Sequence, residues 1–186
     1  MQKLADYNKP KLIDFLNERL AFERSGVKLY DRILEKLKEE DDENVLRMLD
    51  DMQEHRDQEK EHEEWLEEQI RTLGGSAHAV TEHSDLVTRE SKGIEEVVMS
   101  DAELPHLIHA LLAAELVDNA GWDLLVQIAG EAGDREAKRE FKKRLHHEEE
   151  HLLLMRKAVE RFAFHEVLGE KLKMPGGTLE SLNPLS

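Results

Sequence analysis

Acidic residues stand on the apolar helical stripes of this sequence, in a pattern that each half of the chain repeats. In each half, a lone glutamate lies on the stripe of one predicted helix, and a Glu-x-x-His sequence lies on the stripe of the next. The residues are Glu23 with Glu59 and His62 in the first half, and Glu115 with Glu148 and His151 in the second. A carboxylate facing a core needs a partner, because an isolated charge is costly to remove from water.

Apolar residues spaced alternately by three and four predict four long helices, at about residues 8–37, 48–73, 105–130 and 134–162. Asn8 and Pro10 suit the start of the first helix, and Gly74 suits the end of the second. Asp134 is placed to cap the fourth. Residues 76–103 form a connection with a short helix predicted around residues 84–99. A connection this long indicates a crossover and not a tight antiparallel turn.

The predicted fold class is therefore all-α, a four-helix bundle with a long crossover between helices 2 and 3. A length of 186 residues suits one domain, and aromatic residues make up only 5% of the chain, which favours long helices over sheets. We expect residues 1–163 to form the bundle. We expect residues 164–186 to form a partly flexible C-terminal extension, because they contain Pro175, Gly176, Gly177 and Pro184.

The net charge of the chain limits the classes of ligand that it can bind. It has 42 acidic and 26 basic residues, a formal net charge of −16, which repels nucleic acid and attracts metal cations. Cysteine is absent from the sequence, which excludes disulfides, thiolate zinc sites and iron–sulfur clusters. The sequence contains no run of 18 apolar residues and begins without an apolar signal core, so we expect no membrane span and a cytoplasmic location.

Four carboxylates gathered in a bundle core are expected either to be mostly protonated or to have cations among them, and two divalent ions would cancel their four negative charges. Residues three apart on a helix share a face, so each Glu-x-x-His pair can reach the same ion or adjacent ions. Imidazole nitrogens suit iron, zinc and manganese better than calcium or magnesium. A third such sequence, from Glu103 to His106, has no matching stripe position and is discounted. Pairing of the lone glutamates with arginine or lysine of a neighbouring helix is the alternative, but the facing stripes contain few basic residues.

These residues and their spacing resemble the ferritin-like superfamily, which includes ferritins, bacterioferritins, rubrerythrins and manganese catalases. The resemblance covers about residues 11–163 and includes the crossover. It implies two bridging ligands, Glu59 and Glu148. It also implies that Glu23 and His62 bind one metal and that Glu115 and His151 bind the other. Tyr30, seven residues after Glu23, matches a tyrosine that ferritins place near the site.

The sequence departs from individual branches of the superfamily. Bacterioferritins carry a haem-binding methionine directly after the bridging glutamate, whereas this chain has Lys60, so no haem is expected. Rubrerythrins carry a cysteine-ligated iron domain, which this chain cannot form. They also carry a second carboxylate three residues after the third-helix ligand, where this chain has the shorter Asp118. Asp118 is expected either to bind metal or to support a metal-bound histidine.

The resemblance implies a cofactor of two iron ions, or manganese as the alternative, reacting with O2 or H2O2. The function would then be either iron oxidation (ferroxidase activity) with iron storage, or peroxide scavenging with an external electron donor. The alternatives are a di-manganese catalase-like enzyme, a non-catalytic metal-binding or stress scaffold, and a bundle without metal. A homodimer is the default assembly. Residues 176–186 resemble the docking tails of ferritin-like cargo of encapsulin shells. Encapsulin cargo and a larger cage are therefore alternatives, and a disordered end is another interpretation of the tail.

Several other residues carry two interpretations. Tyr30 is expected either to hydrogen-bond at the site or to pack in the core, and Trp122 is expected to pack in the core. His55, one turn from Glu59, is either an extra ligand or a histidine at the bundle end. His146 and His147 are assigned mostly to a solvated face. A second metal site near the crossover would draw on four histidines, His78, His83, His106 and His109.

Overall fold

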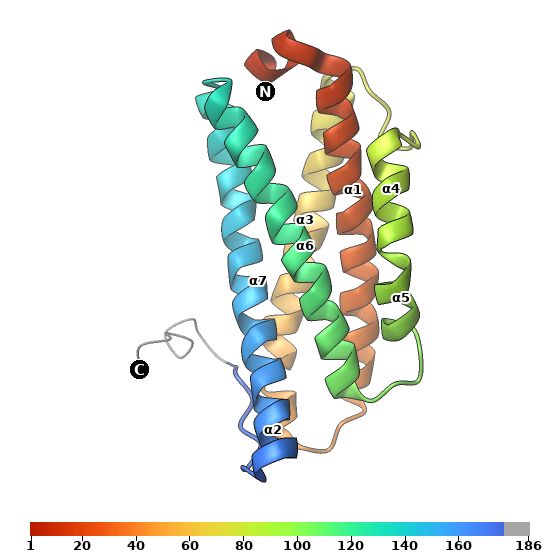
Figure 1. Cartoon of the computed structure of the whole chain (residues 1–186), viewed down its shortest axis with the longest axis vertical. Helices are drawn as coiled ribbons and strands as arrows, with labels where there is room; N and C mark the ends of the chain where they lie inside the picture. Colours follow the sequence, from red (N-terminus) through yellow and green to blue (C-terminus); the bar gives the residue numbers. More distant parts are fainter. Residues whose placement is uncertain (177–186) are drawn as a thin grey trace.

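Four long helices run side by side in the computed structural model, which describes residues 1–176 (Figure 1). The described part contains seven helices and no strand. They are α1 (Gln2–Lys38), α2 (Glu43–Leu46), α3 (Leu49–Thr72), α4 (Glu82–Glu90), α5 (Lys92–Val98), α6 (Leu104–Glu131) and α7 (Arg135–Leu168). The bundle consists of α1, α3, α6 and α7, as the apolar periodicity predicts. The all-α fold class is therefore confirmed.

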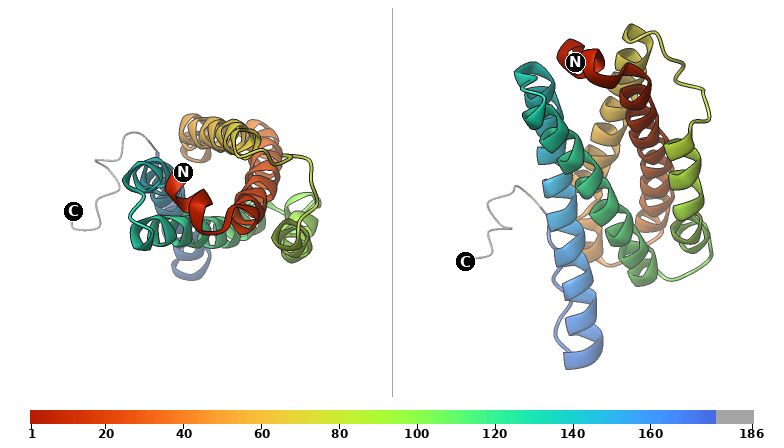
Figure 2. Two further views of the ribbon diagram at one scale, coloured as in Figure 1. Left: turned by 90° about the horizontal axis from the view of Figure 1, so that it is seen from above. Right: turned by 45° about the horizontal axis from the view of Figure 1, so that its top comes forward.

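The long helices pack as two pairs. α1 packs against α3, and α6 packs against α7, while α1 also contacts α6 and α3 contacts α7. The connection between the pairs descends along α1 as α4 and α5, so that α6 begins at the end of the bundle where α3 begins (Figures 1 and 2). This is the expected crossover. It contains two short helices that meet at Ser91, where a single helix is expected from the sequence.

The first helix starts earlier than the sequence predicts. Residues 2–7 are already helical, and the chain bends at Asn8, whose backbone is extended (φ −158°, ψ 81°). The Asn8 side chain accepts a hydrogen bond from the Lys11 backbone N–H at 3.2 Å, so it caps the main part of α1 as expected. Leu4 and Ala5 of the preceding segment are buried, which explains why this segment folds back over the bundle end.

The other helix ends follow their capping residues. Asp134 accepts a hydrogen bond from the Ala137 backbone N–H at 3.0 Å and starts α7, as predicted. Gly74 follows α3 with φ +82°, a conformation that favours glycine. α2, which is not expected from the sequence, is capped by the Asp42 side chain.

The core consists of two apolar clusters at different heights in the bundle. One cluster contains Leu16, Leu66, Trp122 and Phe141, and the other contains residues such as Ile33, Met52, Leu111 and Met155. On each long helix, the predicted ligands lie in the stretch between the two clusters. The fold therefore places one polar layer at mid-height, closed above and below by apolar side chains.

Helix α7 continues to Leu168, beyond the predicted end of the bundle at residue 163, and stops at Gly169 with φ +67°. The following residues are not helical, but Met174 is buried against the apolar cluster of Met52. The tail resemblance concerns mainly residues 177–186, which lie outside the described part of the chain. Within the described part, no helix combines the length and apolar character that a membrane crossing needs.

Candidate metal centre

The structure brings the six predicted ligands together at mid-height of the bundle. All six side chains are buried, with at most 3% of each residue exposed. α1 and α6 each supply one glutamate, while α3 and α7 each supply a glutamate and a histidine. This arrangement follows from the repeat in the sequence, because the same pair of helices is formed twice.

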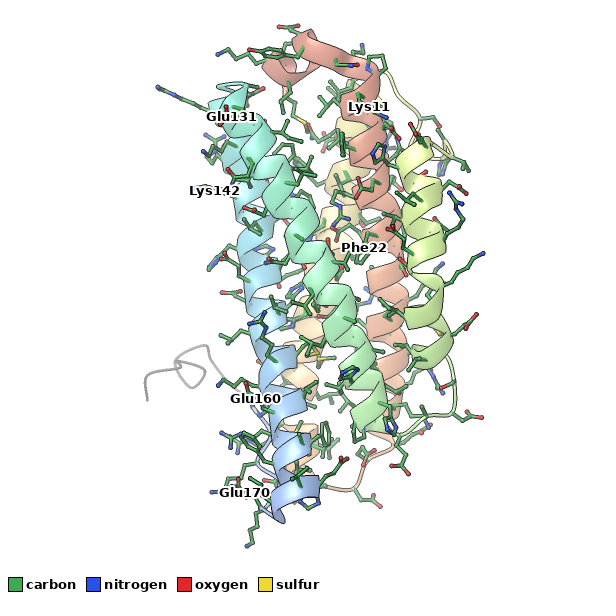
Figure 3. All side chains as sticks on the ribbon, in the orientation of Figure 1. Lys11, Phe22, Glu131, Lys142, Glu160 and Glu170 are labelled. Carbon is green, nitrogen blue, oxygen red and sulfur yellow. The ribbon has the colours of Figure 1, made fainter. Side chains whose placement is uncertain are left out.

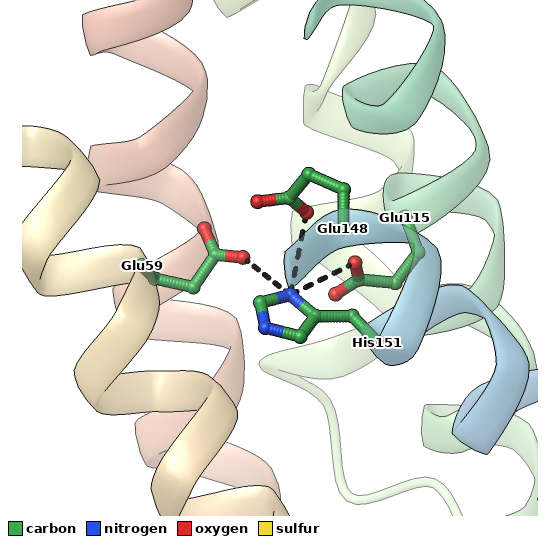
Figure 4. A group of neighbouring side chains, drawn as sticks. All are labelled: Glu59, Glu115, Glu148 and His151. Carbon is green, nitrogen blue, oxygen red and sulfur yellow. Dashed lines mark ion pairs between the residues drawn. The ribbon is translucent and has the colours of Figure 1, made fainter. Parts of the chain in front are cut away.

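One half of the centre is formed around His151 (Figure 4). Its Nδ1 atom lies 3.2 Å from Glu59 Oε1, 3.6 Å from Glu115 Oε2 and 3.3 Å from Glu148 Oε2. One ring nitrogen carries at most one proton, so it cannot satisfy three carboxylates by hydrogen bonding. Ligand atoms of these four residues lie within 4.8 Å of one another, a spacing that a single ion can span.

The other half is formed around His62. Its Nδ1 atom lies 3.2 Å from Glu23 Oε2 and 3.0 Å from Glu148 Oε1. The two oxygens of Glu148 thus face the two histidines separately. Glu59 also lies in a group with Glu23, Asp118 and Glu148. Both glutamates that the resemblance assigns as bridges therefore occur in candidate groups of both halves.

The residues present fit a pair of metal ions. Five buried carboxylate oxygens have no hydrogen-bond partner, two each on Glu59 and Glu148 and one on Glu115. Nδ1 of His151 has none either, although the three carboxylates surround it. Buried acceptors are nearly always satisfied in native proteins, so these groups call for a cation. A set of carboxylate oxygens and imidazole nitrogens suits iron, manganese or zinc.

Each central histidine makes a contact through its other ring nitrogen. Nε2 of His151 lies 2.7 Å from Oε1 of Gln58, which can only accept, so Nε2 donates there and the neutral ring leaves Nδ1 free to bind a cation. Nε2 of His62 lies 3.0 Å from Nδ1 of His147. Gln58 and His147 directly precede Glu59 and Glu148, the two glutamates that the resemblance assigns as bridges, so the repeat extends to these neighbours. The helical periodicity of the sequence does not predict these contacts.

The aromatic residues of the repeat contact the centre reciprocally. The Tyr30 hydroxyl donates to Glu115 at 2.6 Å, and the Trp122 indole N–H donates to Glu23 at 2.8 Å. Each aromatic residue thus holds the lone glutamate of the opposite half. For Tyr30 this is the hydrogen-bonding alternative. For Trp122 the expectation of packing alone was incomplete, because its indole N–H also needs a buried acceptor.

Gly26 provides the space for the Glu59 carboxylate. A Cβ atom on Gly26 would lie well inside van der Waals contact of Glu59 Oε2. Glycine is unfavourable in a helix interior, so its presence one turn after Glu23 has a packing reason. The signal in the sequence was a lone glycine on the stripe of α1, which periodicity alone does not interpret.

Asp118 is held by a buried arginine. Arg19 Nη1 donates to Asp118 Oδ1 at 2.6 Å, and both side chains are nearly inaccessible. The expectation that facing stripes offer few basic residues was incomplete, because Arg19 is buried and Gly121 leaves room for its guanidinium. Asp118 supports Arg19 and not a histidine. Within the described part of the chain, none of the four central glutamates forms an ion pair with arginine or lysine.

Proton affinities in the metal-free centre reflect the crowded charges. Burial alone would lower the pKa of His62, but Glu23 and Glu148 raise it to about 9. Burial raises the pKa of Glu59 well above its usual range, and Glu148 and Glu23 raise it further. Burial lowers the pKa of His147 to about 4, and His62 contributes, so His147 is neutral and can accept a hydrogen bond at neutral pH. Without cations, protons take over part of the charge compensation.

Burial and the carboxylates Glu115 and Glu59 raise the pKa of Tyr30 well above 10, which keeps the phenol protonated as a donor. His55 is buried and stacks on His151 with ring centroids 4.2 Å apart, and burial keeps its pKa well below the usual value. Its ring belongs to none of the candidate ligand groups of the described residues. The geometry therefore favours a role for His55 in packing against His151.

The crossover histidines do not gather. Among the four, His83 alone joins a candidate group of the described residues, with Asp14 and Glu82. Asp14 accepts hydrogen bonds from both the backbone N–H and the ring of His83, and Lys11 pairs with Asp14 and Glu82. These contacts satisfy the cluster and attach α4 to α1, so a second metal site is not needed to explain it.

Comparison with known proteins identifies the fold. No family model matches the sequence, and no curated protein matches it with statistical significance. The structure is similar to a crystal structure described as that of ferritin like, diiron-carboxylate proteins from Bacillus anthracis str. Ames. The TM-score is 0.62 at 16% sequence identity, covering 81% of this chain and 96% of the other. The chain therefore has the ferritin-like fold, and the resemblance stated from its sequence is confirmed at that level.

Proposed function

We propose that this protein binds two metal ions, most simply two iron ions, and reacts there with O2 or H2O2. The observation that carries the proposal is the set of five buried, unpartnered carboxylate oxygens that converge with two imidazoles. Two divalent ions would cancel the four glutamate charges, which is why the fold can tolerate them. The similar protein described as diiron-carboxylate supports iron in preference to manganese.

The roles of the residues follow from their positions. Glu59 and Glu148 would bridge the ions, Glu23 and His62 would bind one, and Glu115 and His151 would bind the other. Gln58 and His147 would keep the ligating Nδ1 atoms unprotonated and oriented, while Tyr30 and Trp122 would fix the two terminal glutamates. When bound, the metal pair supplies electrons to the oxidant. The apolar clusters on either side would limit access of water to this layer.

The physiological outcome depends on where the electrons come from and where the iron goes. If ferrous iron is the substrate and leaves oxidised, the protein is a ferroxidase that serves iron storage. If iron stays and is reduced again, the protein scavenges peroxide or oxygen. The second route needs an external electron donor, because a chain without cysteine cannot hold an iron–sulfur or rubredoxin-type carrier.

The first experiment is elemental analysis of the purified protein together with its metal-to-chain ratio. We expect close to two metal ions per chain, and both Glu59→Ala and Glu148→Ala should lose the dinuclear complement. Glu64→Ala, an exposed glutamate on the same helix as Glu59, is the control and should retain it. Two ions per chain in either bridging variant would contradict the ligand assignment.

Activity assays then separate the alternatives. Ferrous oxidation and peroxide consumption should be measured after loading with iron and, separately, with manganese. Oxidation of iron supports the proposed iron function. Peroxide turnover by the manganese form alone would favour a catalase-like enzyme, and binding without turnover would favour a metal-binding scaffold.

A further inference from the structure

The outer face of α6 is unusually poor in charge for this protein. The chain contains 68 charged residues among 186, yet residues 104–130 contain only three, Glu115, Asp118 and Asp123. Two of these point into the core, so Asp123 alone is exposed. Asp123 accepts a hydrogen bond from Gln127 at 3.2 Å. Leu116, Val117 and Leu124 are 44–45% exposed on the same face. No other helix of the described part covers this side of α6 in Figures 1 and 2.

The exposed positions of α6 form one continuous seam. Its members recur at steps of three and four, which is the spacing of a helix that packs along another helix. They are the exposed His109, Leu116, Ala120, Leu124, Gln127 and Glu131 and the half-buried Ala113, and the exposed Val117 and Asp123 flank them. α6 is 28 residues long, or roughly 42 Å at ~1.5 Å per residue. A seam of this length with a small residue at its centre allows close approach of a second helix.

The seam is complementary to itself. In an antiparallel pairing about a two-fold axis at Ala120, residue n of one copy lies opposite residue 240 − n of the other. Leu116 then lies opposite Leu124 of the second copy, and Ala113 lies opposite Gln127. His109 lies opposite Glu131, whose carboxylate can accept from the imidazole; Figure 3 labels Glu131 at the end of α6. The leucines therefore meet near the centre, Asp123 lies opposite Val117 at the edge of the contact, and the ends meet with complementary chemistry.

The charge distribution favours a second copy of this chain as the partner that covers the outer face of α6. At a net charge of −16, two copies repel each other over most of their surfaces, so they can approach only where charge is scarce. A two-fold interface uses the same patch on both copies, and this patch meets that condition. An apolar groove of about 490 Å³ between α1 and α6, lined by Leu12, Phe15 and Ile128, adjoins the seam and extends the apolar area.

We propose that the protein forms a two-fold homodimer through the outer face of α6, with antiparallel α6 helices that cross at Ala120. This interface lies on the side of α6 opposite the metal centre. Its test is therefore independent of the proposed function. Leu116 and Leu124 would be the central contacts of the interface.

The test measures the mass of the full-length protein in solution by sedimentation velocity and native mass spectrometry. We expect a dimer for the unchanged protein. Leu116→Glu should weaken dimerisation by about 100-fold or more, because it places a negative charge beside Asp123 of the second copy at the centre of the interface. Leu86→Glu is the matched control, since Leu86 on α4 is also 44% exposed, and it should stay dimeric. Far-ultraviolet circular dichroism verifies that each variant is folded.

A cysteine test addresses the register directly. The chain lacks cysteine, so Ala120→Cys introduces a single thiol that meets its own copy at the two-fold axis. Mild oxidation should yield a covalent dimer, whereas Ala163→Cys, at an exposed alanine of α7, should not. A monomeric unchanged protein at roughly 0.1 mM, a concentration at which weak dimers are populated, would overturn the proposal, as would a dimeric folded Leu116→Glu variant. A dimer in which Ala120→Cys fails to cross-link would overturn the α6 pairing.

Discussion

Glu148 places one carboxylate between two histidines, with Oε1 facing His62 and Oε2 facing His151. It comes from α7, while the two histidines come from α3 and α7. A single side chain thus links both halves of the centre. Glu59 occupies the opposite position, and the space for its carboxylate depends on a residue without a side chain.

Gly26→Ala should reduce metal affinity by roughly 10- to 100-fold, because the new methyl group would occupy the place of Glu59 Oε2. Alanine is otherwise preferred over glycine in a helix by about 1 kcal/mol, so helix content should not fall. Titration of the metal-free protein with Co(II), followed by absorbance, measures the affinity. Gly93→Ala in α5 is the control, because a Cβ atom there meets nothing within 4 Å. Equal affinities of the two variants would show that Gly26 does not position Glu59.

Gln58→Leu should also weaken metal binding by roughly 10- to 100-fold, because His151 would lose the acceptor that fixes its proton on Nε2. Gln58→Glu keeps an acceptor oxygen and should restore most of the affinity. Gln53→Leu, at an exposed glutamine of the same helix, should have no effect. The ligand-field spectrum of bound Co(II) gives a readout beyond affinity, since it reports the geometry around His151. An unchanged spectrum in Gln58→Leu would argue against a positioning role.

The six candidate ligands could be predicted from the sequence because they recur at helical spacing on the apolar stripes of both halves of the chain. The residues that orient them could not be predicted in the same way. Gln58 and His151 are 93 residues apart, and Arg19 and Asp118 are 99 apart, so their contacts depend on how helices pack. A lone glycine or a glutamine at a half-exposed position carries no periodic signal.

At the scale of helices, the predictions agree with the structure where a local signal exists. Asn8, Gly74 and Asp134 mark helix boundaries because each acts on backbone groups within a few residues. The break at Ser91 and the helical segment before Asn8 were missed. Both depend on burial against other helices, as the buried Leu4 shows, and not on local capping.

The capping residue of α7, Asp134, leads us to expect a pH dependence of the free energy of unfolding. Burial opposes ionisation of Asp134, but the hydrogen bonds from Ala137 and Leu4 and the amino-terminal ammonium outweigh it and lower its pKa. A carboxylate with a lowered pKa in the folded state stabilises the protein above its unfolded pKa of about 4, and this contribution is lost as the pH falls through the folded value.

Asp134→Ala should therefore destabilise the protein by about 1 kcal/mol at pH 7, with a smaller loss for Asp134→Asn, which can still cap. The difference between the unchanged protein and Asp134→Asn should shrink as the pH is lowered below 4. Urea unfolding at a series of pH values measures it. A difference that stays constant down to pH 3 would show that the charge of Asp134 does not contribute.

At the scale of the whole molecule, the order of apolar and polar layers along the bundle determines the environment of the candidate metal centre. Apolar clusters above and below leave one polar layer. In it Asp118 pairs with Arg19, but the four central glutamates have no arginine or lysine partner among the described residues. The acidic surface adds a long-range attraction for cations. We therefore expect metal binding to stabilise the molecule, because only the folded state assembles the four carboxylates.

Metal loading should raise the thermal midpoint of unfolding. At a free metal concentration 100 times the dissociation constant, a ligand that binds only the folded state adds about 2.7 kcal/mol. For a chain of this size that corresponds to a rise of roughly 5–10 °C. Removal of metal with a chelator should reverse the rise, because protons then have to compensate the buried charge of Glu59 and its neighbours. Differential scanning fluorimetry of metal-free and loaded protein makes the comparison.

A variant of Glu148 tests whether a rise in the thermal midpoint comes from metal bound at the candidate centre. Glu148→Gln removes the shared charge while keeping the volume of the side chain. Its metal-free form should be less stable than the unchanged protein, because Glu148 pairs with both His62 and His151 when metal is absent. The same variant should lose most of the stabilisation by metal. If it is stabilised by metal as much as the unchanged protein, the ions bind elsewhere on the acidic surface. If its metal-free form is as stable as the unchanged protein, the contacts of Glu148 with the two histidines do not stabilise the metal-free bundle.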